Sequence, residues 1–148
     1  MWGNKQPKIL IVEDDATNHP LFTDAFEAAG FKVLIVDHAE EGFVDEVASY
    51  EPDVISMDLM IAKTGVENPR DGFYAIDLLK IDDRTKHIPI IVVSNFFEEK
   101  KVQFAKEVGA VDYYNLQGQT ISKLAEHFKE FVANPKKYKP SHPIFREA

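Results

Sequence analysis

Short apolar runs alternate with amphipathic stretches along most of this chain, and that alternation restricts the possible folds more than any other feature. Runs of β-branched and aliphatic residues without regular polar interruption are typical of strands buried on both faces. The predicted strands cover residues 8–12, 31–36, 52–57, 88–94 and 110–114. Apolar residues at spacings of three and four predict helices between them. The predicted helices cover residues 17–30, 39–50, 72–81, 96–109 and 119–133.

A regular strand–helix order predicts an α/β fold in which five parallel strands are joined by right-handed crossovers. Helices then cover both faces of a doubly wound sheet. The first helix is predicted to end at Gly30, a suitable residue for a helix C-terminus. Its predicted apolar face consists of Leu21, Phe22, Ala25, Phe26 and Ala29.

The composition indicates a globular domain and excludes several classes of function. The chain has 148 residues, enough for one domain with its own core, and its formal net charge is −8. Nucleic-acid binding needs a basic surface, so we expect none. The absence of cysteine excludes disulfides, thiolate metal sites and a cysteine nucleophile. No apolar run is long enough for a signal peptide or a membrane span, so we expect a cytoplasmic protein without membrane contact.

Acidic side chains directly follow two of the predicted strands. Glu13 and Asp14 come after the first strand and Asp58 after the third, while Ser94 closes the fourth. In doubly wound sheets, ligands bind beyond the carboxyl ends of the strands, so these side chains converge if their strands are neighbours. Like charges at close range repel one another, and Mg²⁺ prefers oxygen ligands. The sequence therefore predicts a magnesium site at this edge.

Acids that follow strands also serve as ordinary helix N-caps, because the helix N-terminus attracts negative charge. Asp15 and Asp37, taken singly, are interpreted as caps of this kind. The combined set of acids and Ser94 favours the cation site instead.

The segments ILIVEDD, PDVISMDLM, PIIVVSN and GAVDYYN, in this order and spacing, resemble the receiver domains of response regulators in two-component signalling. The resemblance covers about residues 8–132 and implies the flavodoxin-like strand order 2-1-3-4-5. It implies that Asp58 accepts a phosphoryl group from a histidine kinase or a phosphotransfer protein. It also implies direct Mg²⁺ ligation by Asp14, Asp58 and the backbone carbonyl of Met60, with Glu13 acting through a metal-bound water.

The same resemblance implies roles for two residues near the later strands. Ser94 matches the hydroxyl residue that hydrogen-bonds the phosphoryl group, and Tyr113 matches the aromatic residue that swings inward on activation. A packed strand aromatic remains an equally open interpretation of Tyr113. A receiver is a module of a phosphorelay rather than an enzyme, apart from phosphorylation and dephosphorylation of its own Asp58.

Two departures from the family pattern affect these expectations. The family carries a lysine soon after the fifth strand, and Leu116 stands there in this chain. Leucine can neither donate a hydrogen bond nor neutralise charge. The loop after the third strand is longer than usual, and Ala62 stands where a proline is typical. We interpret this loop as a solvated insertion; the alternative is that Lys63 or Arg70 replaces the missing lysine.

The chain is predicted to divide into a receiver domain over residues 1–134 and a C-terminal tail over residues 135–148, with no output domain. The readout must then be a protein partner or a homodimer. Tyr138, Ile144 and Phe145 can anchor the tail on the domain or on a partner, with partial disorder as the default expectation. His19 is interpreted as a residue at the rim of the site rather than a phosphoryl donor.

Three other functions fit parts of the pattern. A pseudo-receiver scaffold or adaptor that works without phosphorylation is favoured by Leu116 and opposed by the intact acids. A haloacid-dehalogenase-like phosphatase needs an Asp-x-Asp motif after the first strand. The first position of that motif should be the nucleophilic aspartate, and this chain has Glu13 there, which opposes this function. A flavin-binding flavodoxin needs a phosphate-binding loop there, and an acidic loop opposes phosphate.

Overall fold

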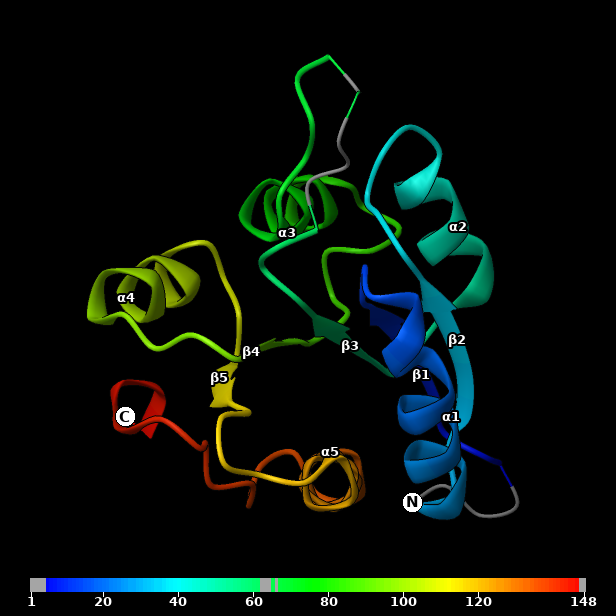
Figure 1. The fold of residues 1–148 in the computed structure, drawn as a ribbon, viewed down its shortest axis with the longest axis vertical. Helices are drawn as coiled ribbons and strands as arrows, with labels where there is room; N and C mark the ends of the chain where they lie inside the picture. Colours follow the sequence, from blue (N-terminus) through cyan, green and yellow to red (C-terminus); the bar gives the residue numbers. More distant parts are fainter. Residues whose placement is uncertain (1–4, 62–64, 66, 147–148) are drawn as a thin grey trace.

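The computed structural model describes residues 5–61, 65 and 67–146. Within this part of the chain, five parallel strands form one sheet in the order β2-β1-β3-β4-β5 (Figure 1). The strands are β1 (Lys8–Val12), β2 (Lys32–Val36), β3 (Val54–Met57), β4 (Ile90–Ser94) and β5 (Asp112–Asn115). The α-helices are α1 (His19–Ala28), α2 (Phe43–Tyr50), α3 (Gly72–Ile81), α4 (Glu99–Glu107) and α5 (Ile121–Ala133). The predicted fold class and strand order are confirmed.

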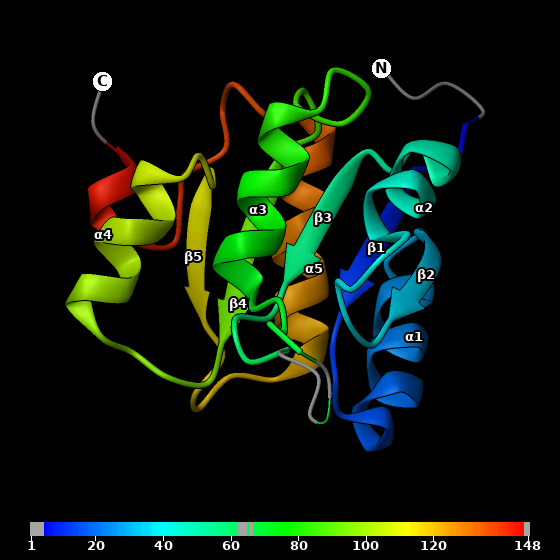
Figure 2. The ribbon, with the colours of Figure 1, turned by 90° about the horizontal axis from the view of Figure 1, so that it is seen from above.

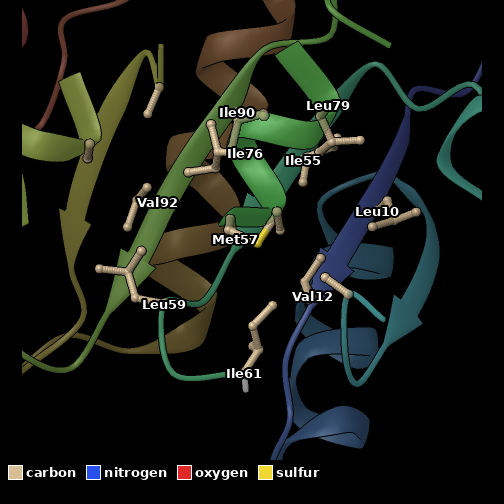
Figure 3. Close-up of a cluster of buried hydrophobic side chains, with 14 of the residues drawn as sticks. Leu10, Val12, Ile55, Met57, Leu59, Ile61, Ile76, Leu79, Ile90 and Val92 are labelled. Atoms are coloured by element: carbon tan, nitrogen blue, oxygen red, sulfur yellow. The ribbon is translucent and has the colours of Figure 1, made fainter. Parts of the chain in front are cut away.

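Helices α1 and α5 cover one face of the sheet, and α2, α3 and α4 cover the other (Figure 1). Strand β1 shows why its sequence is apolar without alternation. Ile9 and Ile11 point into the core under α1 and α5, while Leu10 and Val12 point into the core under α2 and α3 (Figure 3). Because both faces of the strand are buried, neither set of positions can be polar.

Two predicted helix details differ from the structure, and a third is confirmed. Leu21 is 56% exposed, because the buried residues of α1 are Phe22 and Phe26. Helix α2 begins at Phe43, after Gly42 at φ +91°, so Gly42 is its N-cap and Asp37 caps nothing there. Asp15 does act as a cap, for the short 3-10 turn η1 (Ala16–Asn18). Asp37 was therefore wrongly interpreted as a cap, since a left-handed glycine turn separates it from the helix.

Helix α4 begins at Glu99, three residues later than predicted. Phe96 and Phe97 lie in the preceding connection from β4 and are both exposed. Glu98 adopts an extended conformation as the N-cap. The β4–α4 connection is therefore an aromatic loop at the carboxyl edge of the sheet rather than the first turn of a helix.

The chain beyond α5 turns back over the sheet at β5, and its last described residues lie beside α4 (Figure 2). Its last described element is the 3-10 helix η2 (Pro143–Arg146). Tyr138 packs against the core under α1 and α5, whereas Ile144 and Phe145 pack against the opposite core. The described part of the tail is thus held on the domain. No helix within the described residues is long and apolar enough to cross a membrane.

Candidate functional site

The carboxyl ends of β1 and β3 bring three acids together. The two strands are neighbours, and Val12 lies opposite Met57, so the residues that follow each strand emerge at the same edge. The Asp58 N–H donates to the Val12 carbonyl at 3.2 Å and continues the ladder by one residue. Carboxylate oxygens of Glu13, Asp14 and Asp58 all lie within 4.8 Å of one another. Among the described residues, this is the one such group of potential metal ligands.

Asp58 is held in a partly buried position with few compensating contacts. Its Oδ1 accepts a hydrogen bond from the Met60 N–H at 3.0 Å. Burial raises the pKa of the Asp58 carboxyl, and the nearby Asp14 charge raises it further. Backbone N–H groups of Met60 and Leu59 oppose this shift without cancelling it. Among the described residues, no cationic group contributes to the pKa shift of Asp58.

The pKa of Glu13 is raised for the same reasons as that of Asp58. Burial raises the pKa of Glu13 to about 7, and the charges of Asp58 and Asp14 add to the increase. One carboxylate oxygen accepts the Asp15 N–H at 3.0 Å, which lowers the pKa only in part. No Lys or Arg of the described residues forms an ion pair with any of the three acids. A hard divalent cation with oxygen ligands fits this donor set.

The start of α3 braces the backbone behind Asp58. A Cβ atom on Gly72 would lie 2.5 Å from the Asp58 carbonyl oxygen and 2.7 Å from the Leu59 Cα, so only glycine fits this contact. The Gly72 N–H donates to the Leu59 carbonyl at 3.1 Å. Asp71 caps the helix by accepting the Tyr74 N–H at 2.8 Å. The position of Asp58 is therefore fixed from two sides, by β1 and by α3.

Ser94 and Tyr113 lie on the next two strands and are joined through Phe96. Ser94 ends β4, directly beside β3, and is buried; its Oγ accepts the Phe96 N–H at 3.0 Å. Tyr113, on β5, is 1% exposed, and its hydroxyl donates to the Phe96 carbonyl at 2.6 Å. Burial raises the pKa of the Tyr113 hydroxyl. Tyr113 thus packs inward and also holds the β4–α4 connection.

The Leu116 side chain is apolar and does not replace the lysine that is usual at its position. Its side chain packs against the core under α1 and α5, and its N–H donates to the Ser94 carbonyl at 2.8 Å. The Arg70 guanidinium donates to the Ala39 carbonyl at 3.1 Å and lies over the Tyr74 ring at 5.8 Å. In this conformation Arg70 is therefore engaged near α2. Lys63 and Ala62 lie outside the described residues.

His19 is the first residue of α1, and its Nε2 lies 2.7 Å from the Glu13 carbonyl oxygen. It therefore lies beside the acid group and can fix the chain direction after β1 by donating to that carbonyl. The hydrogen bond is to backbone and leaves the carboxylates of the group without a histidine contact.

The sequence interpretation missed a second buried acid, Asp112, at the start of β5. It is 0% exposed and accepts the N–H groups of Tyr113 at 2.8 Å, Ser141 at 2.7 Å and His142 at 3.1 Å. The Tyr138 hydroxyl also donates to it. The signal that could have revealed it is a charged residue in the predicted apolar strand over 110–114, because a buried charge requires partners.

Comparison with known proteins gives a consistent result. A family model described as the response regulator receiver domain matches residues 9–117. The polar-differentiation response regulator DivK of Brucella anthropi is 26% identical over 126 residues, covering 85% of this chain and 96% of the relative. A putative response regulator from Chloroflexus aurantiacus has a TM-score of 0.72 at 23% identity, covering 88% of this chain and 100% of that chain. The phosphorylated cyanobacterial phytochrome response regulator RcpA has a TM-score of 0.71 at 20% identity, covering 89% and 97%. The two structural likenesses concern the fold.

Proposed function

Because this chain belongs to the response-regulator receiver family, we propose that it is the phospho-accepting module of a two-component phosphorelay, with Asp58 as the acceptor. The observation that carries this proposal is the group formed by Glu13, Asp14 and Asp58, whose carboxylate oxygens lie within 4.8 Å of one another. The raised pKa values of Glu13 and Asp58 support it, because they mark negative charge that the fold leaves uncompensated.

Mg²⁺ is the cofactor that these oxygen donors fit. We assign Asp14, Asp58 and the Met60 carbonyl as its direct ligands, and Glu13 as a ligand through a bound water. When bound, Mg²⁺ would neutralise charge on the carboxylates and on the phosphoryl oxygens. Its charge would also keep the Asp58 carboxylate ionised at neutral pH, which a nucleophile requires.

The transfer reaction assigns a simple role to Asp58. One of its carboxylate oxygens forms the new O–P bond while the P–N bond to the donor histidine breaks. The imidazole leaves with the bonding electron pair and is then protonated. The hydrogen bond from the Met60 N–H and the brace from Gly72 orient the carboxylate, so the nucleophile needs little reorganisation before attack.

Ser94 and Tyr113 act after transfer in this proposal. The Ser94 hydroxyl, which now accepts the Phe96 N–H, would donate to a phosphoryl oxygen. Tyr113 is the switch aromatic, because its hydroxyl holds the Phe96 carbonyl two residues beyond Ser94. Leu116 withholds the usual cationic contact, so part of the compensation must come from the metal and Ser94.

The partners follow from this chemistry. We propose a histidine kinase or phosphotransfer protein as the donor and a protein, including a second copy of this chain, as the receiver of the signal. A cytoplasmic location agrees with the cysteine-free composition. The domain is a signalling module whose own reactions are limited to gain and loss of the Asp58 phosphoryl group.

The test is incubation of the full chain with Mg²⁺ and acetyl phosphate, followed by intact-mass measurement. We expect the mass of one phosphoryl group in the parent protein and none in Asp58→Asn. Modification elsewhere, or none with any donor or kinase, would favour the scaffold function instead.

A calorimetric Mg²⁺ titration tests the metal ligands separately. We expect Asp14→Asn to weaken binding by roughly 10-fold or more, because one direct ligand is lost. Asp15→Asn is the matched control, since this neighbouring acid caps η1 and lies outside the group. Equal affinity in Asp14→Asn and in the parent would show that the metal site is misplaced.

A further inference from the structure

The C-terminal segment over residues 138–146, here named the C-terminal latch, lies across β5, the last strand of the sheet (Figure 2). An edge strand exposes unpaired backbone groups and is usually protected. The first three residues of β5 are buried, whereas the residues of β2 at the opposite edge are exposed or half-buried. The chain therefore uses its own C-terminal segment to cover one edge.

The first anchor of the latch is the Asp112 carboxylate. It accepts three hydrogen bonds from the latch, from the Tyr138 hydroxyl, the Ser141 N–H and the His142 N–H. His127 of α5 lies beside it, with Nε2 3.5 Å from Oδ2. These groups fill the hydrogen-bonding capacity of a fully buried carboxylate, so the anchor is strong in the folded state. Loss of only some of these hydrogen bonds would leave a buried charge without partners, which is costly in free energy.

The second anchor is the β4–α4 connection and α4 itself. The His142 ring stacks on Phe97 with centroids 5.7 Å apart, and its Nε2 lies 3.8 Å from the Glu99 carboxylate. The Lys106 ammonium donates to the Ile144 carbonyl at 2.8 Å. Phe97 is exposed, so this anchor is weaker than the buried one and can be lost by a local change in the connection.

The β4–α4 connection is also the segment that the candidate site controls. Ser94 and Tyr113 hold Phe96 by its N–H and its carbonyl respectively. The next residue along the chain, Phe97, contacts the latch. If the Ser94 Oγ moves toward a phosphoryl oxygen to donate its hydrogen bond, its distance to the Phe96 N–H changes, and Phe97 would then move relative to His142.

From these contacts we propose that the C-terminal latch is the output element of this domain: it is seated by the β4–α4 connection, and phosphorylation of Asp58 loosens it and uncovers β5. This inference rests on the proposed function for its trigger, whereas the coupling between connection and latch stands on the contacts alone. Movement of the latch would give this chain a readout of phosphorylation even though Leu116 cannot make the usual lysine contact with the phosphoryl group. A ligand shifts an equilibrium only through contacts that differ between two states, and Phe96–Phe97 supplies such a contact.

Hydrogen–deuterium exchange of the full chain tests the coupling without any ligand. We expect Phe97→Ala to speed exchange at the Ser141 and His142 amides by roughly tenfold, because the seat of His142 is lost. The matched control is Phe104→Ala, since Phe104 has almost the same exposure, 45% against 46%, but packs on Phe73 of α3. In the reverse direction, Asp112→Asn should speed exchange at the Phe96 amide, because coupling is reciprocal.

The second arm adds Mg²⁺ and acetyl phosphate and measures the intact mass of the same sample. Phosphorylated protein with faster exchange at the Ser141 and His142 amides supports the proposal, and phosphorylated protein with unchanged exchange overturns it. If no phosphoryl group is gained, the proposed function fails, and the ligand-free variants decide the coupling alone. Exchange in Phe97→Ala that matches Phe104→Ala, with the Phe96 amide unaffected in Asp112→Asn, overturns the coupling.

Discussion

Asp58 is partly buried just after β3 and Asp112 is fully buried at the start of β5, and their surroundings shift their pKa values in opposite directions. Burial disfavours the charged form of each. At Asp112 this effect is outweighed by hydrogen bonds from His127, Tyr138, Ser141 and His142, which bring the pKa below its usual value. At Asp58 two backbone N–H groups face burial and the charge of Asp14, and the pKa stays raised.

The difference shows that burial alone does not identify a functional carboxylate. Asp112 has its hydrogen-bonding capacity filled by the protein, so its charge stabilises the native state. Asp58 and Glu13 keep unfilled capacity beside like charges, so their charge destabilises the protein until something cationic binds. We propose the unsatisfied acids as the reactive site, whereas the satisfied acid is a structural anchor.

The largest expected effect comes from breaking the satisfied acid. Asp112→Asn removes the negative charge that accepts hydrogen bonds from the Tyr138 hydroxyl and two backbone N–H groups. The new amide N–H₂ is itself a donor and cannot accept them. We expect a loss of about 2–4 kcal/mol in the free energy of unfolding. Urea denaturation measures it, with Asp83→Asn as the control, because Asp83 is an exposed acid paired only with Lys86. A loss no larger than in the control would mean that the Asp112 hydrogen bonds contribute little.

The next effect is a pH dependence set by Glu13. Its folded-state pKa of about 7 lies above the ordinary 4.5, so between these values the folded protein binds more protons than the unfolded chain. Stability of the metal-free protein should therefore fall as pH rises through this window, by about 1–2 kcal/mol after allowance for solvent screening.

Asp112 acts in the opposite direction, because its lowered pKa gives stability that is lost only as pH falls below its ordinary 3.8. The two contributions are therefore separated on the pH axis. Thermal melts in chelator across about pH 5 to 7.5 check the Glu13 contribution. Parent and Glu13→Gln should differ in slope, and equal slopes would contradict it.

A smaller effect, of opposite sign to that of Asp112→Asn, is expected from Asp58, the proposed acceptor. Asp58→Asn removes one of three crowded charges, so it should raise the unfolding free energy of the metal-free protein by about 1 kcal/mol after screening. Denaturation in chelator and in excess Mg²⁺ checks this. The gain in unfolding free energy should shrink when Mg²⁺ is added. If Asp58→Asn instead destabilises the protein in chelator, the two aspartates do not differ in their effect on stability.

The smallest effect on stability should come from Leu116→Lys. Leu116 is half-buried, so a lysine can keep its stem on the core under α5 and extend its ammonium to solvent, at a cost of about 0.5–1 kcal/mol. Its more informative effect is on signalling. NMR shifts around Tyr113 on adding beryllofluoride should grow in Leu116→Lys, with Lys63→Ala and Arg70→Ala measured alongside. A large parent response that neither alanine variant reduces would contradict both a weak switch and a substitute cation.

The sequence pattern predicted the parallel sheet, and the family resemblance supplied the strand order that brings the acids together. Parallel strands end at the same edge, so acids that follow adjacent strands must meet, as Asp14 and Asp58 do. Details that depend on long-range contacts could not be predicted. Leu21 has helical spacing but faces solvent, and Asp112 gave no hint of its partners because Tyr138 lies 26 residues away. The helix-cap interpretation of Asp37 failed because Gly42 is the N-cap of α2 instead.

The close approach of α3 to the backbone at Asp58 and Leu59 has a consequence for how related chains can diverge. Gly72 fixes the far end of the connection after β3 against Asp58 and Leu59, and its N–H closes that connection at the base. The entropic cost of a closed loop rises slowly with its length. Related chains could therefore gain or lose residues between Ile61 and Arg70 and reshape the surface beside the acid group, while Asp58 keeps its position.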